Sequence, residues 1–401
     1  MSRKGLVLIA VLIMVCLVLS GCFRKLPNPD LPAASDTEKN EIVITASTVD
    51  NAANNRAVRT SEFVAQIGDK LYVSADNFSQ YLLFEISTGS TRVVRTDDSL
   101  SGSMWGNTAF MVYDGKLCLP ESDFVKTKLS DRHIDLETGE VVKAQTVWFE
   151  GGGFWYPIVS EGVLYYSDYN TICSYENGEN RTLVTAEELQ LPEGYIGEEL
   201  YIGGGCVYYS RKKEHNLFLN RYDFSKQEIT GSVKVTKSEE DINLWEIIAD
   251  GDDAYCIQEN KLYHIDFEKS TCEEIFSCDY EYGMTFNYYD KKLYIGVSYI
   301  NDNFEPGLYM LDTEQPDKGA EQLVKDDDGV DGVYIFDDEY VYYSASFDCL
   351  RRVRLSDKTT EIVFDYQSDL VRGNYYDDDI EGTFFEEAAD YEEASVTEEI
   401  L

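Results

Sequence analysis

Histidine and basic charge are scarce in this 401-residue sequence, and each shortage argues against a class of protein. The only three histidines, His133, His215 and His264, do not cluster, so neither a zinc site nor a histidine-based catalytic triad is indicated. The motifs GxSxG, HExxH and GxxxxGK[ST] are absent. Only 34 Lys and Arg stand against 75 Asp and Glu, a formal charge of −41. Such a surface repels phosphate backbones, so we expect no nucleic-acid partner.

The longest apolar run lies at the N-terminus and is too short for an ordinary spanning helix. It extends over residues 5–19, directly after Arg3 and Lys4, whereas a transmembrane helix needs about 20 apolar residues. A short positive region followed by such a run is typical of a signal peptide. The run ends in Leu-Ser-Gly-Cys at residues 19–22, which resembles the lipobox of bacterial lipoproteins. That resemblance implies that Cys22 is lipidated and becomes the mature N-terminus; the alternative is an ordinary signal peptide or an uncleaved anchor.

We therefore expect a signal peptide over residues 1–21 and an anchor on the outer face of the cell membrane at Cys22. Residues 22–40 contain three prolines and few apolar residues, which predicts a flexible tether. The opposite end, residues 377–401, has eleven acidic residues and no basic one. Such a charge run predicts an acidic tail that is largely disordered. Between them, residues 41–376 should form the folded body.

A short β-prone run recurs seven times within that body. The runs begin at Leu71, Leu117, Leu164, Val207, Ala254, Leu293 and Val341, at intervals of 46, 47, 43, 47, 39 and 48 residues. A further apolar run precedes each of them, and a strand–turn–strand pattern follows each one. Four short strands per unit and a period in the forties are typical of propeller blades. The sequence thus predicts an all-β fold, a seven-bladed β-propeller of four-stranded antiparallel blades between about residues 60 and 365. Because the seventh unit has all four of its own strands, we expect residues 42–45 to cap an outer edge rather than complete a shared blade.

The blade pattern also resembles a known family. The segment LYYSD…I…Y…G at residues 164–178 looks like the YWTD-type blades of lipoprotein-receptor propellers, although no blade carries the full tetrad. The whole chain is similar to bacterial lipoproteins of uncharacterised function with a receptor-related-protein-like β-propeller domain. The resemblance implies the fold and brings no catalytic residues.

Seven cysteines lie in the body, an odd number without a CxxC pair. Cys118, Cys206 and Cys256 occupy corresponding places in expected strands, which favours buried small residues over a disulfide framework. Cys272 and Cys278 could approach each other, and secretion would permit a bridge there.

The acidic runs raise the question of calcium. Residues 326–332 lack the oxygen ligand at the fifth place of a calcium loop, and residues 377–388 lack the bidentate Glu at the twelfth. We therefore predict no metal and no cofactor. Arg351, Arg352 and Arg354 form the one dense basic cluster, which we interpret as a strand face that balances local acids.

Four aromatic residues are the candidate ligand-binding set. Trp105, Trp155, Tyr195 and Trp245 each stand nine or twelve residues before a blade run, near the expected start of an innermost strand. There they could line one rim of the central channel and stack sugars or hold a peptide. Packing between adjacent blades is the alternative use of such residues.

The function we predict is a non-enzymatic binding or scaffold module, monomeric and membrane-anchored, for an envelope protein, a peptide or a glycan. The alternatives are a carboxylate-based hydrolase or lyase on the same fold, and a small-molecule sensor partnered with a membrane protein. A channel-facing carboxyl with a raised pKa would favour an enzyme.

Overall fold

The computed structural model describes the greater part of the predicted body. The described residues are 42–49, 54, 63–76, 81–88, 90–97, 111–119, 121–122, 127–151, 155–167, 170–191, 194, 196–197, 200–237, 244–278, 283–298, 305–345 and 349–365. Cys22, the tether and the acidic tail lie outside them, as do Trp105 and Tyr195.

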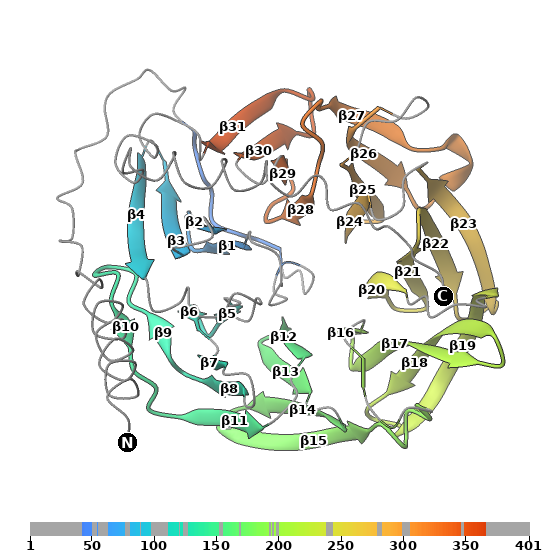
Figure 1. Cartoon of the computed structure of the whole chain (residues 1–401). Coiled ribbons are helices and arrows are strands. Elements are labelled where there is room, and N and C mark those ends of the chain that lie inside the picture. Colours follow the sequence, from blue (N-terminus) through green and yellow to red (C-terminus); the bar gives the residue numbers. More distant parts are fainter. Residues whose placement is uncertain are drawn as a thin grey trace, which may run out of the picture. The chain divides into compact units, whose positions relative to one another are not determined.

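The described strands form seven antiparallel blades that follow one another around a ring (Figure 1). Blade 1 contains β1 (Phe63–Ile67), β2 (Lys70–Asp76), β3 (Tyr81–Ser87) and β4 (Ser90–Asp97). Blade 2 contains β5 (Met111–Tyr113), β6 (Lys116–Cys118), β7 (Glu121–Ser122), β8 (Thr127–Ser130), β9 (His133–Ile134), β10 (Val141–Val142) and β11 (Val147–Gly151). Blade 3 contains β12 (Trp155–Ser160), β13 (Val163–Ser167), β14 (Thr171–Glu176) and β15 (Glu179–Thr185).

The remaining four blades repeat the four-stranded meander. Blade 4 contains β16 (Leu200–Gly203), β17 (Cys206–Lys213), β18 (Asn216–Asp223) and β19 (Glu228–Lys237). Blade 5 contains β20 (Trp245–Asp250), β21 (Asp253–Gln258), β22 (Lys261–Asp266) and β23 (Thr271–Ser277). Blade 6 contains β24 (Met284–Tyr289), β25 (Lys292–Val297), β26 (Gly307–Asp312) and β27 (Glu321–Lys325). Blade 7 contains β28 (Gly332–Ile335), β29 (Tyr340–Ala345), β30 (Cys349–Arg354) and β31 (Thr360–Asp365).

The predicted seven-bladed propeller is therefore confirmed, and the repeated run is the second strand of each blade. The first residue of every run has 0% of its surface exposed, from Leu71 in blade 1 to Val341 in blade 7. Several of these strands, such as β21, β25 and β29, are buried at nearly every position, because each blade packs one face against the blade before it and the other against the blade after it. The only helical element in the described part of the chain is η1 (Pro316–Lys318), and no helix there is long and apolar enough to cross a membrane.

Most of these histidines and cysteines lie on the strands that the sequence predicted. His133 and His264 lie on third strands, β9 and β22. Cys118 and Cys256 are buried in second strands, and Cys206, at the start of β17, is partly buried. Cys272 and Cys278 are free thiols, so the bridge considered between them is not formed.

Blade 2 departs from the regular pattern because its outer three strands are broken. Its sheet divides into one part of order β10-β9-β6-β5 and a second of order β11-β8-β7. The break lies at Asp131, between β8 and β9. The Oδ1 atom of Asp131 accepts hydrogen bonds from the backbone N–H groups of Gln145 (2.7 Å) and Thr146 (2.8 Å). The side chain thus replaces strand pairing where the blade bends.

The ring closes between blades 7 and 1 by side-chain packing. Phe84 of β3 and Phe364 of β31 meet with ring centroids 4.7 Å apart, within one apolar cluster drawn from both blades. The segment 42–49 crosses this seam. Ile44 is buried in the same cluster and its N–H donates to Thr88 of blade 1, while the N–H of Thr48 donates to the carbonyl of Phe336 in blade 7.

Residues 42–45 had been considered as a cap on an outer blade edge, and they instead form part of this seam. Blade 7 keeps all four of its own strands, as the sequence indicated. Arg352 of β30 binds the N-terminal segment at this seam, since its guanidinium donates to the carbonyl of Val43 (2.8 Å).

The meander gives the ring two distinct faces. The turns between the first and second strands and between the third and fourth strands lie on one, which we call the turn face. The starts of the first strands and the connections between blades lie on the opposite one, which we call the connection face. This follows because successive strands of each blade run in opposite directions.

Candidate functional site

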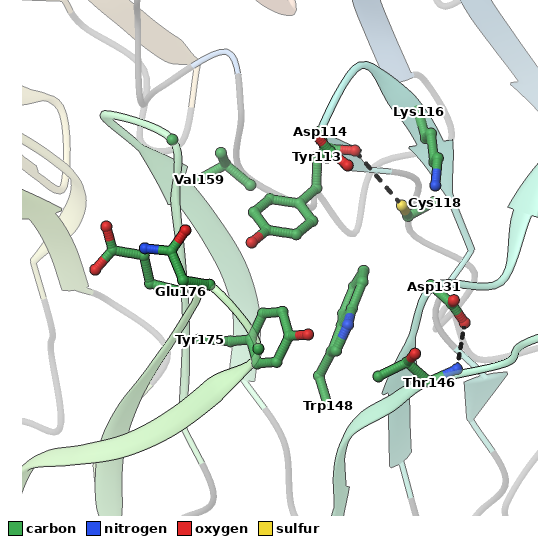
Figure 2. A pocket seen from close by; sticks show the side chains of 13 residues that line it. Tyr113, Asp114, Lys116, Cys118, Asp131, Thr146, Trp148, Val159, Tyr175 and Glu176 are labelled. Carbon is green, nitrogen blue, oxygen red and sulfur yellow. Dashed lines mark hydrogen bonds between the residues drawn. The ribbon is translucent and has the colours of Figure 1, made fainter.

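A pocket of about 510 Å³ opens on the turn face between blades 2 and 3. Blade 2 contributes the β5–β6 turn and parts of β6 and β11, and blade 3 contributes the turns that follow β12 and β14 (Figure 2). Its lining residues are Tyr113, Asp114, Lys116, Cys118, Asp131, Thr146, Trp148, Val159, Gly162, Tyr175, Glu176, Asn177 and Gly178.

Three aromatic rings from two blades form the inner wall of the pocket. Trp148 of β11 lies with its ring centroid 5.1 Å from that of Tyr113 on β5, nearly perpendicular at 76°, and 5.4 Å from that of Tyr175 on β14. Trp148 is 6% exposed, whereas the two tyrosines are partly exposed. Edge-to-face packing of this kind is favourable for aromatic pairs. The tryptophan therefore supports the wall, and the tyrosines present more of their surface to the pocket.

The bend in blade 2 shapes the side of the pocket opposite blade 3. Asp131 and Thr146, which line it, are the residues at which the blade breaks. Burial raises the pKa of the Asp131 carboxyl, but the hydrogen bonds from the backbone of Thr146 and Gln145 outweigh it, and the net pKa is lowered. Asp131 is thus a fixed carboxylate that maintains the bend, and its proton affinity is too low for a general acid at neutral pH.

Cys118 lies at the base of the pocket and is 1% exposed. Burial raises the pKa of its thiol to about 12, although the nearby Lys116 opposes the shift. The sulfur is therefore a neutral thiol at pH 7, and a thiol of this kind is a poor nucleophile.

The mouth of the pocket carries two exposed carboxylates from different blades. Asp114 lies in the β5–β6 turn with a φ of 52°, and Glu176 ends β14. Burial and the neighbouring Tyr175 raise the pKa of Tyr113, and the charges of Asp114 and Glu176 act on it in the same direction. Both carboxylates therefore lie close enough to Tyr113 to make the potential at its hydroxyl negative.

The aromatic residues singled out from the sequence are not part of this pocket. Trp155 and Trp245 are the first residues of β12 and β20, as expected for starts of innermost strands, and so lie at the connection face. With Trp105, Tyr195 and the lipidation residue Cys22 outside the described residues, the predicted ring of aromatics and the lipid anchor both stay predictions.

The sequence reading passed over Trp148, the tryptophan that does line a pocket. Its position in a fourth strand gave no signal, because the candidate aromatic residues were chosen near the starts of innermost strands. Asn180 of blade 3 contacts Trp148 across the blade interface. The side-chain amide of Asn180 donates to the backbone carbonyl of Trp148 (2.5 Å), and its side-chain oxygen accepts a hydrogen bond from the hydroxyl of Tyr166 (2.9 Å).

The basic cluster balances acids, as expected from the sequence. Arg351 binds Asp326 and Asp328 (2.8 Å to the latter), and Arg352 binds Glu361 (2.6 Å). Asp326, in the run considered for calcium, is buried and accepts from both Arg351 and Tyr343. Within the described ranges, no group of three or more His, Cys, Asp or Glu is arranged to hold a metal ion.

No family model and no curated protein matches the chain, whereas many solved structures resemble it in fold. An uncharacterised protein of Listeria monocytogenes EGD-e has a TM-score of 0.44 at 12% identity, with 83% of this chain and 97% of that one covered. The extracellular domain of a putative one-component system from B. thetaiotaomicron has a TM-score of 0.41 at 12% identity, with 77% of this chain covered. Oligopeptidase B from Leishmania major has a TM-score of 0.45 at 9% identity, with 76% of this chain covered.

This chain spans only 39% of the one-component system and 49% of the oligopeptidase. At such identities the likeness concerns the fold alone and carries no argument about activity, partners or location.

Proposed function

We propose that this protein is a lipid-anchored, extracytoplasmic binding module that takes its ligand in the pocket between blades 2 and 3. The N-terminal apolar run and Cys22 support the anchor, and the seven-bladed ring supplies a rigid scaffold for the binding loops.

The observation that carries the proposal is the composition of the pocket. An aromatic wall of Tyr113, Trp148 and Tyr175 stands beside polar side chains on two blades, in a volume of about 510 Å³. Small-molecule and side-chain binding sites fall at roughly 300–1,000 Å³ and combine apolar walls with a few polar groups that fix orientation. The pocket has both properties.

The chemistry of the lining supports binding over catalysis. The thiol of Cys118 is held neutral by burial, and the carboxylate of Asp131 is held by backbone amides. A nucleophile or a general acid requires a pKa shifted toward neutrality, and these two groups are shifted away from it.

Filling the pocket tests the proposal. Thr146 is exposed and lines the pocket, so Thr146→Trp should obstruct it without disturbing the core. Thr91→Trp, at an exposed position on β4 of blade 1, is the matched control. The body of the protein would be immobilised and incubated with a detergent-solubilised envelope fraction, and the captured components compared across the three forms.

We expect a component that wild type and Thr91→Trp capture equally and that Thr146→Trp loses, with all three forms melting at the same temperature. Undiminished capture by Thr146→Trp would contradict the assignment of function to this pocket.

A further inference from the structure

We infer that the pocket between blades 2 and 3 receives a cationic side chain, Lys or Arg, from a basic segment of a partner protein. The inference rests on the proposed function of the pocket and adds the chemical class of its occupant.

The first argument is the state of the two carboxylates at the mouth. Asp114 and Glu176 are exposed, and neither forms an ion pair with any other described residue. At the interfaces of blade 5, by comparison, two acids near the turn between the first two strands are paired across blades: Asp252, in the turn after β20, binds Arg221 of blade 4 (2.6 Å), and Asp250, the last residue of β20, binds Lys291 of blade 6 (2.6 Å). Among the described residues, no cation is paired in this way with Asp114 or Glu176 at the interface between blades 2 and 3.

The second argument is the charge of the residues that line the pocket. Lys116 is the only basic residue of the lining, and it lies on β6 of blade 2. With three lining carboxylates and one ammonium the pocket has a net formal charge of −2, and two of the three carboxylates, Asp114 and Glu176, are at its mouth.

The third argument is the wall behind those carboxylates. A Lys or Arg side chain has an apolar stem and a charged head, and it packs the stem on apolar surface while the head reaches a carboxylate. Val159 and the rings of Tyr113 and Tyr175 offer that surface, and aromatic faces attract cations. The pocket thus fits both parts of such a side chain.

The overall charge adds a long-range attraction. A formal charge of −41 steers basic partners toward the protein and repels acidic ones, with an association rate that falls as salt is added. A neutral glycan would gain nothing from this field, which is why a basic protein segment is favoured over a saccharide.

Capped pentapeptides of sequence Gly-Gly-X-Gly-Gly provide the test, with X as Lys, Arg, Glu or norleucine, the last being an uncharged analogue of Lys. Chitotetraose serves as a neutral saccharide probe. Binding to the full propeller body would be measured by calorimetry or by NMR titration at low and at high salt.

We expect the Lys and Arg peptides to bind at least tenfold more tightly than the norleucine and Glu peptides, and to weaken as salt is raised. Glu176→Gln combined with Asp114→Asn should weaken the cationic peptides at least tenfold. Glu187→Gln, the same change at an exposed acid outside the pocket, should alter binding less than twofold. Thr146→Trp should abolish binding.

Two results would overturn the inference. Equal binding of the norleucine or Glu peptide would show that charge does not select the occupant. Binding of chitotetraose but not of the cationic peptides, lost in Thr146→Trp, would keep the pocket as the binding site and replace its ligand class. If Thr146→Trp also leaves capture from the envelope fraction unchanged, the proposed function itself fails.

Discussion

Arg352 links three parts of the ring closure, and its removal gives a sharp prediction. Its side chain is 3% exposed and its guanidinium pairs with Glu361 of β31 (2.6 Å). It also donates to the carbonyl of Val43 (2.8 Å) and lies 3.9 Å from the ring centroid of Tyr340. One guanidinium therefore joins the third and fourth strands of blade 7 to the N-terminal segment.

The expected cost of Arg352→Met follows from these contacts. Breaking a buried ion pair by removing one partner typically costs about 3–5 kcal/mol, because the remaining charge is left without compensation. Glu361 is 26% exposed and keeps a contact with Arg354 (3.7 Å), so water and that guanidinium offset part of its charge and the lower end of that range applies. The cation–π contact adds about 1–2 kcal/mol, which Met recovers in part by packing on Tyr340. We expect a loss of about 3 kcal/mol in the free energy of unfolding.

The assay is equilibrium unfolding in urea, with Arg181→Met as the control. Arg181 forms an ion pair with Glu179 in which both side chains are about two-thirds exposed, and such a pair contributes about 0–1 kcal/mol. Equal losses for the two variants would refute the argument that Arg352 closes the ring. A smaller urea dependence for Arg352→Met would indicate that the seam opens before the remaining blades unfold.

Four further predictions concern single sites. The side-chain amide of Asn220 is fully buried and has no hydrogen-bond partner among the described residues, so Asn220→Leu should raise the free energy of unfolding by about 1–3 kcal/mol; a loss in urea titrations would show that the amide is satisfied. Burial raises the pKa of Glu85, but Arg92 and Lys70 outweigh it and the net pKa is lowered, so its contribution is complete above an unfolded-state pKa of about 4.3 and is lost as the pH falls through the lowered folded value. The stability difference between wild type and Glu85→Gln should therefore be larger at pH 7 than at pH 3, and a constant difference would be inconsistent with this linkage. Cys22→Ser should abolish labelling by a fatty-acid probe, and undiminished labelling would rule out the anchor. If the predicted aromatic ring binds ligand, Trp155→Ala with Trp245→Ala should weaken binding by more than about 2 kcal/mol at unchanged melting temperature, whereas a large fall in melting temperature would assign both residues to packing.

The blades could be predicted because each one repeats a local pattern. Leu71, Leu164 and Val341 each open one of the recurring β-prone runs, and each is fully buried in a second strand. A four-stranded meander brings neighbours in sequence together in space, so one sequence period corresponds to one structural unit. The count of seven and the order of strands follow from that correspondence.

The pocket could not be predicted, because it depends on contacts between blades. Trp148 and Tyr175 are 27 positions apart and come from strands that do not pair, and only the angle between blades 2 and 3 brings their rings within 5.4 Å. The bend at Asp131 is held by two hydrogen bonds that its carboxylate accepts from the backbone. The residue pattern of a strand indicates which of its side chains are buried, but it does not indicate where a sheet breaks and a pocket forms.

The N-terminal segment was misplaced for a similar reason. The pattern of Ile42–Thr45 predicts an extended apolar segment, and an extended segment can pair with an edge strand or lie across a seam. In the structure the segment lies at the seam, where the carbonyl of Val43 accepts a hydrogen bond from Arg352. The two residues are far apart in the sequence, so the local pattern gives no sign of this contact.

Site-specific photo-crosslinking on the two faces is the most direct test of the central claim, that the turn face at blades 2 and 3 binds the ligand. A photoreactive residue would replace Asn177, in the pocket, or Glu214, in the exposed β17–β18 turn on the connection face. Our account predicts that an envelope component crosslinks at position 177, that Thr146→Trp prevents it, and that position 214 gives no crosslink. A crosslink at position 214 alone would place binding on the face where β12 and β20 begin and would contradict the account.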